Sequence, residues 1–213
     1  MASMLNGLLV AVLLLNLFAL GTSRIRALIN AAGLQGIALG LMPLLVHGHA
    51  NLLSIVVALA TIVLKGAIIP QVLLKALRDA RIKREVEPII GFMPSMLLGA
   101  VGTAASIALA AKLPPLQARV QPLIVPAAFS TVFTGFLLLT TRIKAITQAI
   151  GYLVLENGIF IFGLLLLDAM PFLVELGVLL DVFVGVFVIS IIIHHINREF
   201  ASLDTRHLSS LKE

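Results

Sequence analysis

Three ionisable residues lie inside long apolar stretches of this 213-residue sequence: Lys65, Glu156 and Asp181. At a rise of 1.5 Å per helical residue, each lies about 15 Å from the nearer polar end of its stretch. A hydrocarbon core is about 30 Å thick, so all three are expected near its middle. Charges are costly there, and both carboxylates and ammonium groups favour their neutral forms. Such groups can take up and release protons, so we interpret them as candidates for a proton relay.

A structural interpretation remains open for the same residues. Lys65 can pair with Glu156 or with Asp181 and fix the packing of helices without any proton transfer. Glu175 is a further, weaker candidate. It lies only four residues into its apolar stretch, where water can reach it, and it does not share a helix face with Asp181.

Small and polar residues follow two of the candidates along the chain. Asn157 and Gly158 come directly after Glu156, and Pro70 comes five residues after Lys65. Asparagine can hydrogen-bond across helices, glycine allows close helix approach, and proline frees a backbone carbonyl and can kink a span. We therefore expect these three residues to support the buried charges.

The apolar stretches that position these residues are long enough to cross a membrane. Hydrophobic residues make up 60% of the sequence and charged residues 12%, against about half and a quarter in soluble domains. Lipid-exposed backbone must be hydrogen-bonded within its own segment, so each stretch is expected to be a helix. The sequence thus predicts an all-α, polytopic membrane protein with seven spans, at 4–22, 27–46, 51–77, 88–111, 121–140, 146–167 and 171–195.

Basic residues are distributed unevenly between the two sides of these predicted spans. With seven spans, one side carries 12 of the 15 Lys and Arg residues, and the other side carries only Lys112 and Arg119. Because cytoplasmic loops are enriched in Lys and Arg, the pattern predicts an outside N-terminus and a cytoplasmic C-terminus. There is no basic stripe typical of nucleic-acid binding, no Cys and no catalytic motif. We expect no cofactor, no metal and no catalytic site in this chain.

Two basic loops resemble each other at an offset of 118 residues. Ser23-Arg24-Ile25-Arg26 matches Thr141-Arg142-Ile143-Lys144, and Gly33 matches Gly151. We therefore predict two parallel three-helix repeats, 1–80 and 121–197, joined by a cytoplasmic loop and one helix (81–120) and followed by a cytoplasmic tail (198–213). On this interpretation the first stretch is a true span and not a cleaved signal peptide.

The second half resembles the three-helix K subunit of respiratory complex I. The matching features are the basic loop at 141–144, Gly151-Tyr152 with Glu156-Asn157-Gly158, and a second acid, Asp181. The whole chain resembles more closely membrane component E of hydrogenase-4, found in group 4 nickel–iron hydrogenase and formate hydrogenlyase-type complexes. Its matching motifs are Leu64-Lys65 with Pro70, Val174-Glu175-Leu176-Gly177, and Leu203-Asp204 in the tail. The first repeat departs from the K-subunit pattern, since Ala38 stands where the offset would place a glutamate.

This resemblance implies a subunit without cofactors in the membrane arm of a hydrogenase-like or complex I-like assembly. Its partners would be antiporter-like and other membrane subunits, in a bacterial or archaeal cytoplasmic (inner) membrane. Glu156, Asp181 and Lys65 would contribute to a proton or sodium translocation axis, driven by redox chemistry in other subunits. The alternatives are a structural scaffold subunit without an ion relay, and a small transporter that acts alone.

Overall fold

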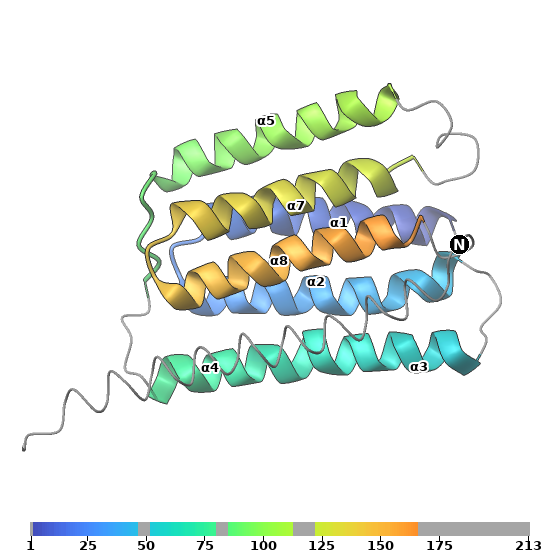
Figure 1. Ribbon diagram of the computed structural model, residues 1–213, viewed down its shortest axis with the longest axis horizontal. Coiled ribbons are helices and arrows are strands. Elements are labelled where there is room, and N and C mark those ends of the chain that lie inside the picture. Colours follow the sequence, from blue (N-terminus) through green and yellow to red (C-terminus); the bar gives the residue numbers. More distant parts are fainter. Residues whose placement is uncertain (1, 47–51, 80–84, 113–121, 166–213) are drawn as a thin grey trace, which may run out of the picture.

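The computed structural model describes residues 2–46, 52–79, 85–112 and 122–165, which are almost entirely helical. The helices are α1 (Ala2–Gly21), α2 (Ile25–Val46), α3 (Leu52–Thr61), η1 (Ile62–Ile68), α4 (Ile69–Asp79), α5 (Phe92–Ala111), α7 (Ile124–Thr141) and α8 (Ala145–Gly163). Elements α3, η1 and α4 follow one another without a break, so they form a single long rod (Figure 1).

Six helices in the described residues are long and apolar enough to cross a membrane. They are Ser3–Gly21, Ile25–Leu45, Ala58–Arg78, Phe92–Ala111, Ile124–Thr141 and Ala145–Gly163. These six correspond to the first six predicted spans, and their composition is that of a multi-pass membrane protein. The seventh predicted span, 171–195, and the tail at 198–213 lie outside the described residues.

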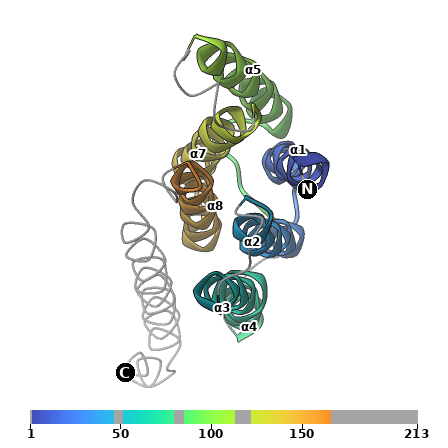
Figure 2. The same ribbon diagram turned by 90° about the vertical axis from the view of Figure 1, so that its right-hand side faces the viewer.

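The six long helices run side by side, in an elongated arrangement rather than a ring. Seen end-on, α5 lies at one edge and the α3–α4 rod at the other, with α7, α1, α8 and α2 between them (Figure 2). Helix α2 contacts α1 and α8 as well as the rod, so it connects the two predicted repeats. The rod therefore lies against α2, within reach of α8.

One predicted boundary was wrong. The fourth span was expected to begin at residue 88, but α5 begins at Phe92. The preceding residues are extended because the two matched basic loops hydrogen-bond to them. The N–H of Val86 donates to Ser23 O (2.8 Å), and the N–H of Ile89 donates to Thr141 O (2.8 Å). The loops that the sequence places on one side thus lie together at one end of the bundle.

The buried side chains form three layers along the helix axes. One apolar cluster lies toward the loop end and includes Leu20, Ile29 and Leu138. A second lies toward the other end and includes Leu9 and Leu39. Between them, α1, α2, the α3–α4 rod, α7 and α8 each contribute at least one buried polar residue: Asn16, Gln35, Lys65, Ser130, Thr131, Thr134, Glu156 and Asn157. Lys65 and Glu156 therefore lie in the middle of the bundle, as their depth in the sequence indicated.

Candidate functional site

Lys65 lies on a π-helical segment in the middle of its span. Element η1 covers Ile62–Ile68, and the N–H of Ile69 donates to Leu64 O, five residues back. Pro70 follows at once, and proline has no N–H with which to bond the preceding turn. The wide turn and the proline together interrupt the regular ladder beside Lys65. Short π-segments inside α-helices occur frequently at functional sites.

Glycines of α2 allow its backbone to lie directly against this segment. A Cβ atom on Gly36 would lie 2.6 Å from Lys65 Cβ and 2.8 Å from the Lys65 carbonyl carbon. A Cβ atom on Gly33 would lie 2.9 Å from Pro70 Cγ, and one on Gly40 would overlap Ile62. Helix α2 therefore fixes the backbone position of Lys65 by direct contact, which any larger side chain would prevent.

The Lys65 side chain reaches across to α8 and meets the predicted carboxylate. Its Nζ lies 4.0 Å from Glu156 Oε2 and donates to Asn157 Oδ1 at 3.4 Å. It also lies 5.5 Å from the centre of the Phe160 ring, within range of a cation–π interaction. Lys65, Glu156 and Asn157 are 7%, 6% and 3% exposed. The structure therefore brings together two of the three deep charges.

A glycine next to the polar site was expected to allow close helix approach. Gly158 packs α8 against α7, since a Cβ there would lie 2.7 Å from Val132 Cγ2 and 3.0 Å from Ala128 O. Asp181 and Glu175 lie outside the described residues, so their relation to Lys65 stays a prediction. Within the described part of the chain, no group of three or more His, Cys, Asp or Glu residues could hold a metal ion.

Sequence reasoning missed a chain of amide side chains that continues from Asn157. The Asn157 Nδ2 donates to Gln35 Oε1 (3.3 Å), and Gln35 Nε2 donates to Asn16 Oδ1 (2.8 Å). In turn, Asn16 Nδ2 donates to Thr131 Oγ1 (2.8 Å). With Lys65 included, the line has five buried side chains and crosses the bundle. They come from the rod, α8, α2, α1 and α7. The available signal was that Asn16 and Gln35 are isolated amides deep in apolar stretches.

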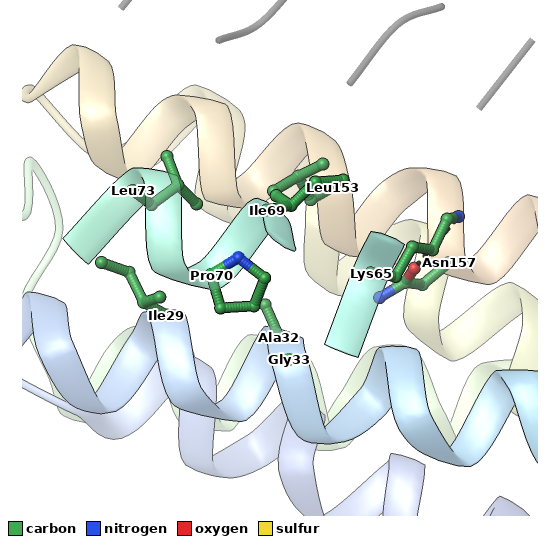
Figure 3. Close-up of a pocket in the computed structure, with 9 residues that line it drawn as sticks. All are labelled: Ile29, Ala32, Gly33, Lys65, Ile69, Pro70, Leu73, Leu153 and Asn157. Atoms are coloured by element: carbon green, nitrogen blue, oxygen red, sulfur yellow. Dashed lines mark hydrogen bonds between the residues drawn. The ribbon is translucent and has the colours of Figure 1, made fainter. Parts of the chain in front are cut away.

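A small cavity of about 10 Å³ lies beside Lys65 and Asn157. Its wall is otherwise mostly apolar, with Pro70 and Gly33 on one side (Figure 3). It is lined by Ile29, Ala32, Gly33, Lys65, Ile69, Pro70, Leu73, Leu153 and Asn157. A cavity needs about 10–15 Å³ to hold one water molecule, and the ammonium and the amide provide polar partners for one. The site has room for a water and not for a larger solute.

A second buried cation, Arg142, lies at the loop end of the bundle. The sequence places it in the basic loop at 141–144, and in the structure it is fully buried. Its guanidinium donates to Leu20 O (2.8 Å) and to Ser95 Oγ (3.4 Å), and it lies 5.4 Å from the Phe92 ring centre. Burial lowers the pKa of Arg142, although arginine remains protonated at neutral pH. This residue joins the ends of α1, α5 and α7.

Comparison with known proteins finds one informative similarity. An uncharacterized protein of Mycobacterium tuberculosis, Rv0085, is 33% identical to this chain over 191 residues. The match covers 89% of this chain and 87% of the mycobacterial protein. No family model matches the chain. No solved structure matches it either.

Proposed function

This chain belongs to the same family as the mycobacterial protein Rv0085, and we propose that it is a membrane-arm subunit of a hydrogenase-like or complex I-like assembly. In this role its buried charges contribute to a proton or sodium translocation axis that redox chemistry in partner subunits drives. The observation that carries the proposal is the Lys65–Glu156 pair, two titratable groups 4.0 Å apart in the central polar layer. Ionisable residues at such depth mark ion pathways or proton relays.

The geometry around this pair suits proton exchange better than solute transport. The adjacent cavity has room for about one water molecule, which can carry a proton but leaves no space for a substrate. The π-segment and Pro70 interrupt the helix beside Lys65. This arrangement supports an ion relay.

The remaining features of the proposal concern topology and partners. We place a seventh span at 171–195, which brings Asp181 to the depth of the polar layer and Glu175 toward the outer surface. The N-terminus would be outside and the C-terminus cytoplasmic, in a bacterial or archaeal cytoplasmic membrane. The partners would be antiporter-like membrane subunits, and the chain itself would carry neither cofactor nor catalytic site.

The test uses the complex that the tagged full-length chain brings out of its native membrane. In Glu156→Gln, we expect normal complex yield and normal electron transfer, but redox-driven proton translocation reduced to background. The matched control is Lys75→Gln, which removes an exposed charge from the same rod as Lys65. Proton translocation in Glu156→Gln equal to that of the unmodified complex would exclude the relay.

A scaffold role is the alternative, and the same contacts favour it to a lesser degree. The Lys65–Glu156 pair and the amide chain join five helical rods, as a purely structural network would. A scaffold predicts the opposite pattern of results. Glu156→Gln would then lower the yield of the complex, while the protons translocated per electron in the surviving complexes would not change.

A further inference from the structure

The hydrogen bonds of the buried chain all point the same way. Each side chain from Lys65 through Asn157, Gln35 and Asn16 donates to the next, and the line reaches Thr131. An amide has both a donor and an acceptor end, so three amides in a row can line up in either of two directions. What selects the direction must therefore lie at the ends of the line.

Both ends of the line fix its direction. At one end, the ammonium of Lys65 has donors only, so Asn157 must present its oxygen to it. At the other end, the Thr131 hydroxyl donates to Ala127 O at 2.7 Å, and a carbonyl can only accept. A neutral amine at Lys65 would have a lone pair as well as two N–H donors. The ammonium thus permits one direction, whereas the amine permits both.

We propose that Asn157, Gln35 and Asn16 are positioning residues that hold the Lys65 ammonium and transmit its protonation state to Thr131 on α7. While Lys65 is charged, the hydrogen bonds of the line can run in only one direction, and the Thr131 hydroxyl donates to Ala127 O. When Lys65 passes a proton to an acceptor such as Glu156, the line is free to reverse. Thr131 then donates to Asn16 instead, and its bond to the α7 backbone opens.

The amides transmit the direction of the hydrogen bonds along the line, but they do not conduct protons. Each amide nitrogen keeps its own two hydrogens in both directions of the line, so reversal requires only rotation of side chains. A proton on Lys65 therefore has no route through Asn157 toward α1. Among the described groups, Glu156 and water in the adjacent cavity can exchange it. This inference deepens the proposed function and rests on it, because it assigns the amides to the same relay.

The charged groups around Lys65 are consistent with its protonation state setting the direction of the hydrogen bonds. Glu156 on α8 faces it across 4.0 Å. Arg26 on α2 and both Lys75 and Arg78 on α4 are exposed and lie toward the loop end. Among the described elements that pack against η1, α8 thus supplies the titratable partner.

The test is the side-chain amide signal of Asn16 in the full-length protein. The protein is labelled with ¹⁵N-asparagine and held in lipid nanodiscs, and the signal is identified by its loss in Asn16→Ser. The key variant is Asn157→Asp, which is nearly isosteric but offers Lys65 and Gln35 acceptors only. Gln35 must then turn its nitrogen toward α8, and Asn16 must donate to Gln35 instead of Thr131. We expect the Asn16 signal to move by more than its linewidth.

Four further variants separate transmission along the line from a general structural effect. Adding Gln35→Met breaks the line, so Asn157→Asp should then leave the Asn16 signal where Gln35→Met alone puts it. Lys65→Arg preserves a cation that can only donate, so the Asn16 signal should stay in place. Lys65→Met removes the cation that fixes the direction of the line. The Asn16 signal should then move part of the way toward its position in Asn157→Asp. Lys75→Met, on the same rod but outside the line, should have no effect.

The proposal is overturned if Asn157→Asp leaves the Asn16 signal unmoved, or moves it equally with Gln35→Met present. An unmoved signal in Lys65→Met would likewise overturn it. If Asn157→Asp does not fold, Gln35→Glu imposes the same reversal on Asn16 and gives the same expected movement. The measurement involves no ion translocation. A line that reverses in a protein that does not pump would contradict only the proposed function.

Discussion

Lys65 and Arg142 are both buried cations, but their surroundings differ. Lys65 lies in the middle of the bundle with a carboxylate, an amide and an aromatic ring around its ammonium. Arg142 lies at the loop end, where a carbonyl, a hydroxyl and an aromatic ring contact it. No carboxylate of the described residues pairs with Arg142.

This difference separates a structural charge from a titratable one. Arginine keeps its proton under all physiological conditions, so its charge can only stabilise. The carbonyl that it contacts belongs to Leu20 in the last turn of α1, where a cation also suits the helix dipole. Lysine and glutamate can exchange a proton between them. The Lys65–Glu156 pair is therefore a place where the charge distribution can change, and the Arg142 site is one where it cannot.

The largest expected effect is at the structural charge. Arg142→Ala should lower the free energy of unfolding by about 4 kcal/mol, since it leaves a cavity and removes donors from the Leu20 carbonyl and from Ser95. Denaturant titration in detergent micelles measures this change. Arg142→Met, which refills most of the volume, should recover only the packing part. Unchanged stability in Arg142→Ala would mean that the guanidinium does not hold the helix ends together.

A smaller loss of stability is expected for variants of the Lys65–Glu156 pair, and the losses of the single variants should not add up in the double variant. Lys65→Met should cost about 3 kcal/mol, because it removes the cation that faces the Glu156 carboxylate. The double variant Lys65→Met/Glu156→Gln should regain part of that loss, since replacing both partners of a buried pair costs less than removing one. The same titration gives the coupling energy. Strictly additive losses would show that the two groups do not interact.

The smallest effect tests how the backbone positions Lys65. Gly36→Ala would place a methyl group 2.6 Å from Lys65 Cβ, so α2 and η1 must move apart. Overpacking of this kind costs about 2 kcal/mol. The matched control is Gly7→Ala on α1, where a Cβ meets nothing within 4 Å. That control should be as stable as the unmodified protein by the same titration, and equal stability of the two variants would contradict the close contact.

Much of the architecture could be predicted from hydropathy alone. Six of the seven predicted spans correspond to helices of membrane-spanning length, and the depth calculated for Lys65 and Glu156 agrees with their place in the central layer. These predictions succeed because lipid allows few backbone structures and the helical rise is constant. The repeat boundaries and the seventh span stay predictions.

The details of the site could not be predicted in the same way. The amides at Asn16 and Gln35 carry no charge, so the search for ionisable residues did not include them. The π-segment at Lys65 lies directly against glycines of α2, which are remote in sequence. The sequence places Arg142 in a loop between two spans, where a basic residue usually is solvated. Its burial depends on Phe92 and Leu20 of other helices.

The extended segment at 85–89 has a consequence for biosynthesis. Its first hydrogen bond, to Ser23, needs only the loop after α1, but its bonds to Thr141 and Ile143 need a loop synthesised more than 50 residues later. While the ribosome is still adding α5 and α7, one edge of this segment is open. A chain truncated before residue 141 would therefore expose an unpaired backbone edge.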